Sequence, residues 1–258
     1  MNAKQSYYVV GDFVYDEVLG VLSLFANEAL RKQGHFRVGV SGGLMAAILA
    51  EGLYALRTDF NKWQIFFCDE RFVPKDSADS IFGCYERNLL DFRSEVPKTS
   101  FYPVNTSLSP TEAAVDYEKT IRKAFNLENS EEIPSFDMLL LDIGTDGHTA
   151  SLFPAHPLLE EDTMLIAPIE NSPEPPANRV TMTYTLINNA KVCMFAAVGK
   201  SRAEILKRMF VDKDQSLPVT RVNPINGEVI FVVCNEAHSL IELSQEMEDI
   251  TDDFNEIL

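Results

Sequence analysis

Short apolar runs alternate along the chain with longer stretches in which apolar side chains recur every three or four residues. The short runs predict strands at residues 7–10, 36–40, 63–69, 136–144, 164–169, 179–187, 191–198 and 229–234. The longer stretches predict helices, which follow residue 12, extend from 43 to 56, begin at 110, cover 201–210 and begin again at 236. The run at 136–144 is apolar almost throughout, which is typical of a central parallel strand covered on both faces.

Capping residues mark the ends of two of these helices. Asp12 is expected to cap the first helix, and Gly34 is expected to end it. Ser109 and Glu112 have the spacing of a capping box, with a proline at the first helical position between them. One face of the helix that they open is predicted to carry Ala113, Tyr117, Ile121 and Ala124.

The order of the elements predicts an α/β fold with a mostly parallel, doubly wound, Rossmann-like sheet flanked by helices. Composition does not shift along residues 1–245, so we expect a single domain there. The proline-rich stretch at 172–177 is predicted to be a loop, because structured sequence resumes at once. Residues 246–258 form an acidic C-terminal tail, to which no chemistry is assigned.

Charge excludes several classes of partner. The 258 residues include 22 Lys and Arg against 39 Asp and Glu, a net charge of −17, which repels nucleic acid and anionic membranes. An anion-binding site must therefore be built from a few cationic side chains that lie close together. The longest apolar stretch, residues 192–198, is too short to span a bilayer, and no secretory leader opens the sequence, so a cytoplasmic location is expected.

Cysteine and histidine usage argues against a structural metal. Three of the four cysteines lie in apolar runs and no CxxC pair is present, so we expect buried, reduced thiols. The four histidines do not supply the ligand spacing of a zinc site. A structural metal is therefore not expected.

Three predicted strands end in turns rich in glycine or polar residues, at the positions where α/β sheets bind ligands. Ser41, Gly42 and Gly43 form the first turn, where two glycines allow backbone N–H groups at a helix start to approach a phosphate or sugar. A plain tight turn is the alternative. The turn is not a Walker loop, because no Lys-Ser/Thr pair follows it.

The second turn contains Asp69, Glu70 and Arg71, charges of both signs after a buried strand. An acidic side chain can fix the arginine guanidinium, which then offers paired hydrogen bonds to a phosphate or carboxylate. A structural ion-pair network is the alternative interpretation.

The third turn contains Asp146, Gly147 and His148, just past the predicted central strand. A histidine at this point is placed as a general base would be, and Asp146 can orient its imidazole. The alternative is a structural histidine, which is the role expected for His156 between alanine and proline.

Cations also lie near the ends of two later strands. Arg179 opens the predicted strand that follows the proline-rich loop, and Lys200 and Arg202 follow Gly199 at the end of another strand. These side chains can be ordinary surface charges. Together with Arg71, however, they favour one converging anion pocket in an otherwise acidic protein.

The chain resembles the 6-phosphogluconolactonase family, whose superfamily also contains glucosamine-6-phosphate deaminases. The resemblance is strongest in residues 67–74 (FCDERFVP) and 146–154 (DGHTASLFP), and it extends from about residue 8 to residue 238. The loop at 162–181 and the Ser41-Gly42-Gly43 turn look like the eukaryotic version of the family. The resemblance implies the NagB/RpiA-type α/β fold.

The resemblance also implies a carboxylic ester hydrolase that opens 6-phospho-D-glucono-1,5-lactone to 6-phosphogluconate in the oxidative pentose phosphate pathway, without metal or organic cofactor. It makes His148 the base that activates water, with Asp146 beside it. Arg71, Arg179 and a cation after Gly199 would hold the phosphate or the developing oxyanion. The substrate-binding residues expected on this basis are Ser41, Gly42, Gly43, Asp69, Glu70, Arg71, Gly147, Arg179, Lys200 and Arg202.

Three positions depart from the family pattern. Arg202 stands at the usual lysine position, Asp142 where relatives commonly have glycine, and Thr145 where many have proline. Asp142 adds a carboxylate near the predicted site. These changes keep a catalytically weak paralogue that binds sugar phosphate as an alternative.

An amino-sugar-phosphate deaminase is disfavoured by Arg71, because that position is typically tyrosine in the deaminase branch. A small-molecule substrate is the expected partner, and the sequence does not decide between monomer and homodimer.

Overall fold

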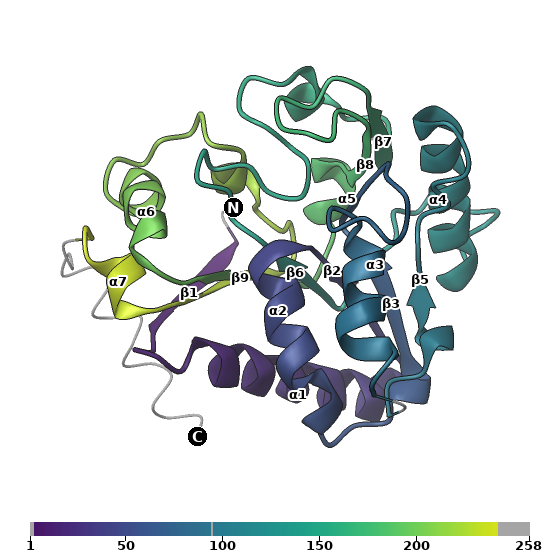
Figure 1. Cartoon of the computed structure of the whole chain (residues 1–258), viewed down its shortest axis with the longest axis horizontal. Helices are drawn as coiled ribbons and strands as arrows, with labels where there is room; N and C mark the ends of the chain where they lie inside the picture. Colours follow the sequence, from purple (N-terminus) through teal and green to yellow (C-terminus); the bar gives the residue numbers. More distant parts are fainter. Residues whose placement is uncertain (1–2, 94, 242–258) are drawn as a thin grey trace.

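Seven parallel strands form the central sheet in the order β1-β10-β9-β6-β2-β3-β5 (Figure 1). The structure is a computed structural model that describes residues 3–93 and 95–241, so the predicted acidic tail at 246–258 lies outside the described residues. The strands are β1 (Lys4–Val9), β2 (Phe36–Val40), β3 (Trp63–Phe67), β5 (Phe101–Tyr102), β6 (Met138–Leu141), β9 (Val192–Ala197) and β10 (Glu228–Val233). The predicted parallel sheet is confirmed, and β6 is its central, fully buried strand.

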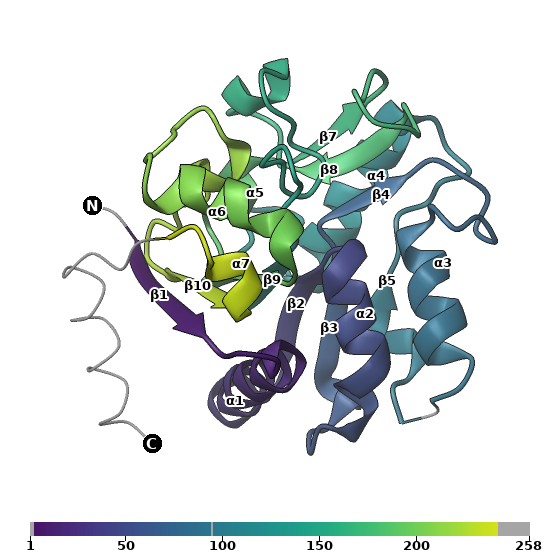
Figure 2. The ribbon, with the colours of Figure 1, turned by 60° about the vertical axis from the view of Figure 1, so that its left-hand side comes forward.

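Helices connect these strands and flank the sheet (Figures 1 and 2). The α-helices are α1 (Val14–Gln33), α2 (Gly43–Gly52), α3 (Ile81–Tyr85), α4 (Pro110–Ala124), α5 (Tyr184–Ile187), α6 (Ala203–Phe210) and α7 (Asn235–His238). Short 3-10 turns cover Leu53–Ala55, Phe60–Lys62, Lys98–Ser100, Pro157–Glu160, Lys200–Arg202 and Pro218–Arg221, and a π-helical turn covers Glu86–Leu90. Over residues 3–93 and 95–241, none of the helices has the length and apolar character required to cross a bilayer.

Apolar side chains fill the space on both faces of the sheet. On one face, Leu22 of α1 and Leu49 of α2 line the same apolar space as Leu140 of β6. On the other face, the Phe210 ring of α6 meets the Phe231 ring of β10 edge-on, with 4.9 Å between centroids. Burial of this kind stabilises a fold by about 25 cal/mol per Å² of apolar surface. Helix packing on both faces confirms the doubly wound arrangement.

A second, antiparallel sheet corrects the prediction of one strand over residues 63–69. The strand β3 ends at Phe67, and β4 (Asp69–Arg71) belongs to a three-stranded sheet with β8 (Arg179–Met182) and β7 (Ile166–Ile169), in the order β4-β8-β7. Cys68 joins the two sheets, because its N–H donates to Val40 O at 2.9 Å and its carbonyl accepts from Met182 N at 2.8 Å. The apolar run is therefore continuous in sequence but divided between two sheets.

Residues 179–187 were also predicted as one strand, but β8 ends at Met182 and α5 follows. The carbonyl of Thr183 accepts the N–H of Ile187 at 2.9 Å, so the second half of the apolar run is a buried helical turn. Apolar runs of this length do not distinguish a buried strand from a buried helix. Likewise, the helix predicted to reach residue 56 ends at Gly52 and continues as a 3-10 turn, and the helix predicted from 236 spans only α7 among the described residues.

The predicted helix ends are confirmed in two cases and wrong in one. Gly34 ends α1 in the left-handed conformation, with φ of 78°, and Ser109 and Glu112 form the predicted capping box of α4. Asp12 does not cap α1: the N-cap residue is Phe13, and no side chain caps it. The α4 face is buried at Ala113, Tyr117 and Ile121 and half-buried at Ala124. Cys68, Cys193 and Cys234 are buried free thiols, as predicted.

Replacing Ser109 with alanine is expected to lower the free energy of unfolding by about 1 kcal/mol. The substitution removes the hydroxyl that accepts the Glu112 N–H at 3.3 Å. Urea denaturation followed by circular dichroism measures the change as a shift in midpoint. Thr111→Ala, at an exposed position in the same helical turn, is the control. Equal midpoints for Ser109→Ala and the control would contradict the capping role.

Candidate active site

The strand order has its topological switch point between β2 and β6. From β2 the chain adds β3 and β5 on one side, and then continues with β6, β9 and β10 on the other. Ligands of open α/β sheets bind at such a switch point, outside the carboxyl ends of the strands. The loops that follow β2, β6 and β9 lie at this edge, and they contain the predicted residues at 41–43, 146–148 and 199–202.

The loop after β6 forms a bonded pair of Asp146 and His148. The Oδ1 atom of Asp146 lies 2.6 Å from His148 Nδ1 and accepts the His148 backbone N–H at 3.0 Å. An ionised carboxylate can only accept, so Nδ1 carries the proton of the neutral imidazole and the lone pair lies on Nε2. The His148 side chain retains 18% exposure, which leaves it open to a ligand. The structure thus brings the two predicted catalytic residues together.

Two glycines make the geometry of this loop possible. A Cβ atom on Gly144 would lie 2.1 Å from His148 Nδ1 and 2.7 Å from Asp146 Oδ1. Gly147 has a φ of +86°, a conformation that residues with side chains rarely adopt. The turn is closed by the Gly147 N–H, which donates to Gly144 O at 3.0 Å. Gly147 therefore shapes the loop through its backbone.

Arg71 and Arg179 form the second part of the site. They are direct partners in the antiparallel register of β4 and β8, so their side chains leave the same face of the small sheet. Arg179 is buried, and its guanidinium donates to Glu174 O at 2.9 Å and Pro176 O at 3.1 Å. Burial, and then the positive charge of Arg71, lower the pKa of Arg179. The two positive charges repel each other, and an anion beside them would offset that repulsion.

Asp69 offsets part of this positive charge. Its Oδ2 atom lies 3.7 Å from Arg71 Nε, which is too long for a hydrogen bond. Among the described residues, the buried Nε of Arg71 has no hydrogen-bond partner. Its Nη1 atom donates to Asp79 O at 3.2 Å. The Arg71 side chain keeps 27% exposure, so part of its guanidinium remains open to a ligand.

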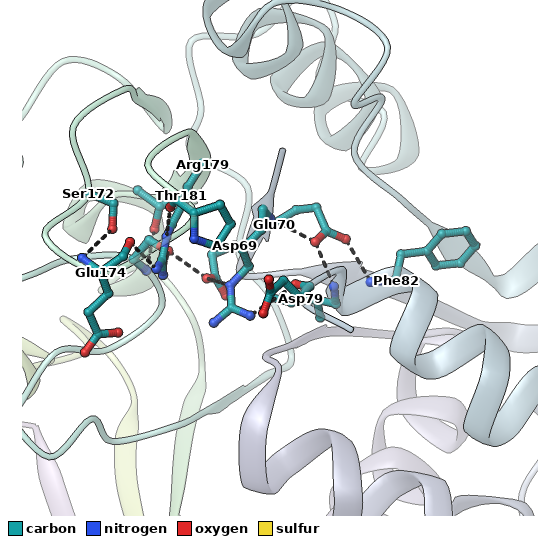
Figure 3. Close-up of polar contacts among 12 residues, drawn as sticks. Asp69, Glu70, Asp79, Phe82, Ser172, Glu174, Arg179 and Thr181 are labelled. Atoms are coloured by element: carbon teal, nitrogen blue, oxygen red, sulfur yellow. Dashed lines mark hydrogen bonds and ion pairs between the residues drawn. The ribbon is translucent and has the colours of Figure 1, made fainter. Parts of the chain in front are cut away.

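Ser151 connects the histidine loop to the arginine pair. Its hydroxyl donates to Asp69 Oδ2 at 2.7 Å, and its backbone N–H donates to Thr181 Oγ1 at 3.1 Å. Figure 3 shows Arg179 and Thr181 beside Asp69. The Phe153 ring contacts both parts, since its centroid lies 4.7 Å from that of the His148 ring and 5.1 Å from the Arg179 guanidinium carbon.

Glu70 is turned away from the arginine pair, toward α3 (Figure 3). Its carboxylate accepts the backbone N–H groups of Arg71, Ile81 and Phe82, each at 2.8 Å. Burial raises the pKa of Glu70 to about 6, although these three hydrogen bonds oppose the shift. The Glu70 carboxylate therefore holds the start of α3 next to β4, and it does not fix the Arg71 guanidinium as expected.

The Asp142 carboxylate lies against the turn after β2. Gly43 has a φ of +59°, and a Cβ atom there would lie 2.0 Å from Asp142 Oδ2. The same oxygen accepts the Leu44 N–H of α2 at 3.3 Å. Ser41 is buried, and its carbonyl accepts the Tyr85 hydroxyl at 2.9 Å. The glycines thus leave room for another group close to the backbone of this turn. The Asp142 carboxylate occupies that room.

The two cations after β9 differ in position. Lys200 is exposed, whereas Arg202 is half-buried. Burial raises the pKa of Asp142, and the positive charge of Arg202 is among the effects that lower it. Of the two cations, Arg202 is thus the one whose charge acts on Asp142.

Glu174 is a member of the cluster that the sequence analysis missed. Single ligand atoms of Asp146, His148 and Glu174 lie within 4.8 Å of one another, a set that can hold a divalent cation. In the structure, Asp146 and His148 are bonded to each other instead. Glu174 is exposed in the proline-rich loop, whose carbonyls hold Arg179. Nothing in the local sequence indicates this contact, because it depends on how the loop folds back over the histidine.

Comparisons with known proteins agree on one family. The family model described as glucosamine-6-phosphate isomerases/6-phosphogluconolactonase matches residues 13–231. The human 6-phosphogluconolactonase is 40% identical over 215 residues, which are 81% of this chain and 82% of the human protein. The rat 6-phosphogluconolactonase is 38% identical over 216 residues, 82% of each chain. The structure of 6-phosphogluconolactonase from Thermotoga maritima superimposes with a TM-score of 0.77 and 28% identity, over 89% of this chain and 100% of that chain.

Replacing Gly144 with alanine is expected to break the Asp146–His148 hydrogen bond, since the new methyl group would occupy the space of both side chains. The proton NMR signal of the bonded His148 Nδ1–H, assigned by its loss in His148→Ala, should disappear. Gly20→Ala is the matched control, because a Cβ there has nothing within 4 Å. Retention of the signal in folded Gly144→Ala would show that the loop accommodates the methyl group.

Proposed function

The chain belongs to the glucosamine-6-phosphate isomerase/6-phosphogluconolactonase family, and we propose that His148 is the general base of its reaction. That reaction is the hydrolysis of 6-phospho-D-glucono-1,5-lactone to 6-phosphogluconate, the second step of the oxidative pentose phosphate pathway. The observation that carries the catalytic assignment is the 2.6 Å contact between Asp146 and His148 at the carboxyl end of β6.

The proposed mechanism uses the free lone pair of His148 Nε2. Nε2 takes a proton from water, and the resulting hydroxide adds to the lactone carbonyl carbon to give a tetrahedral oxyanion. The ring C–O bond then breaks, and the imidazolium returns its proton to the departing ring oxygen. The products are a carboxylic acid, which ionises, and a free hydroxyl. Asp146 stabilises the imidazolium between the two proton transfers.

Arg71 and Arg179 supply the cationic end of the proposed site. Their neighbouring positive charges, with the part of the Arg71 guanidinium that remains exposed, suit the oxygens of a phosphate. Asp69 keeps Arg71 in place through their ion pair. The backbone of Ser41, Gly42, Gly43 and Gly147 would border the sugar, and Arg202 rather than Lys200 would reach it.

The steps above need only water and side chains of the chain, so we propose no metal or organic cofactor. The free thiols of Cys68, Cys84, Cys193 and Cys234 support a reducing compartment, and we propose the cytoplasm.

Replacing His148 with alanine is expected to lower kcat by about 10²- to 10⁴-fold, because water then lacks its base. Freshly made lactone is supplied with 6-phosphogluconate dehydrogenase, and NADPH formation is followed after subtraction of spontaneous hydrolysis. His156→Ala is the control, since that ring contacts Asn171 and the Leu158 N–H instead. Near-native turnover of His148→Ala would refute the role of the base.

Two further outcomes of this assay separate the alternatives. Release of ammonia from glucosamine 6-phosphate would identify a deaminase. Binding of 6-phosphogluconate by folded native chain, without acceleration above spontaneous hydrolysis, would identify the catalytically weak paralogue.

Arg71→Ala is expected to raise KM for the phosphorylated lactone by about 10- to 100-fold, the loss of a hydrogen bond to a charged group. KM for unphosphorylated glucono-1,5-lactone should stay unchanged, because that substrate lacks the group that Arg71 binds. Arg31→Ala, an exposed position in the last turn of α1, removes the same charge elsewhere. Equal changes in KM for the two lactones would argue that Arg71 does not contact the phosphate.

A further inference from the structure

Asp142 lies at the switch point of the sheet because of the strand order. It is the first residue after β6, and β6 pairs with β2 on one side and with β9 on the other. The Asp142 carboxylate therefore stands between the start of α2, which follows β2, and the cationic turn that follows β9. None of the steps proposed for hydrolysis uses this side chain.

The contacts of Asp142 are those of an anion bound at the start of a helix. Its Oδ2 atom accepts the Leu44 N–H at 3.3 Å and lies over Gly43, 2.0 Å from where a Cβ atom would be. Its Oδ1 atom accepts the Ile143 N–H at 2.9 Å. The first N–H groups of a helix carry partial positive charge and attract anions such as phosphate. Here a carboxylate of the chain takes that place.

The surrounding charges support the same interpretation. Burial raises the pKa of Asp142, whereas Arg202 and His148 are among the groups that lower it. The positive charge of Arg202 therefore acts on the Asp142 carboxylate. At the other end of the site, Arg71 and Arg179 are register partners, and the Arg71 side chain keeps 27% exposure. A phosphate finds an exposed guanidinium at Arg71 and a like charge at α2.

We infer that Asp142 is a specificity-determining residue: it occupies the anion position at the start of α2 and thereby confines the substrate phosphate to the Arg71 end of the site. The inference rests on the proposed function. It adds that the phosphate binds at the end of the site that contains Arg71, and not at the end that contains Arg202 and the start of α2. It also gives the Asp142 departure from the family pattern a role in orienting the substrate.

The test measures binding, so it does not depend on turnover. Asp142→Asn keeps the size of the side chain and removes its charge. Isothermal titration with 6-phosphogluconate and with inorganic phosphate is expected to show about tenfold tighter binding to Asp142→Asn than to native chain, because one like charge close to the ligand is lost. Gluconate, which lacks the phosphate, should not show this gain. Asp12→Asn, an exposed position, makes the same change in net charge elsewhere and should leave all three affinities unchanged.

A double substitution locates the phosphate. In native chain, Arg71→Ala should weaken binding of 6-phosphogluconate strongly. In Asp142→Asn, the same Arg71→Ala change should cost at least fivefold less, since the start of α2 then offers a second place for the phosphate. If Asp142→Asn does not fold, Asp142→Gly removes the same carboxylate and has the same expected outcomes.

Two results would overturn the inference. The first is that Asp142→Asn binds phosphate with the same affinity as native chain. The second is that Arg71→Ala weakens the binding of 6-phosphogluconate by the same factor in native chain and in Asp142→Asn. A chain that shows the expected binding contrasts but does not hydrolyse the lactone would refute the proposed function and leave this inference standing. Hydrolysis of the lactone without the expected binding contrasts would support the proposed function and refute this inference.

Discussion

The hydrogen bond between Asp146 Oδ1 and His148 Nδ1 is the interaction on which the rest of the site depends. It fixes the imidazole ring, determines which nitrogen keeps the proton and stabilises the charge that the ring acquires when it takes a second proton. Gly144 leaves room for the pair, and Gly147 gives the turn its left-handed conformation. The loop itself follows the central strand of the sheet, whose two neighbours limit its movement.

Electrostatic focusing is the second requirement, because a net charge of −17 repels a phosphorylated substrate. In the proposed site, the small antiparallel sheet meets this requirement by pairing Arg71 with Arg179 in its register. That arrangement costs free energy through repulsion and desolvation. Asp69 and the carbonyls of the proline-rich loop offset part of the cost. In the proposed site, the remaining attraction is available to a ligand, while the positive charge of Arg202 acts on Asp142.

Local patterns in the sequence were sufficient where neighbours along the chain decide the structure. The capping box at Ser109 and the buried strand around residues 138–141 are of this kind. Local patterns were insufficient where the partners come from distant segments. Strand β4 pairs with β8, more than a hundred residues away, and no pattern near Arg71 predicts that pairing. Glu174 was missed for the same reason. Glu70 was identified as a site residue, yet its hydrogen bonds go to the start of α3, because charge alone does not reveal the direction of a side chain.

The most direct test of this account is the tautomer of His148 in the native chain. Nitrogen-15 NMR at a pH where the imidazole is neutral distinguishes a protonated ring nitrogen from one that bears a lone pair. The account predicts that Nδ1 is protonated and that Nε2 bears the lone pair, since Asp146 accepts from Nδ1. A protonated Nε2 would contradict it, because the nitrogen that faces the substrate would then have no lone pair with which to activate water.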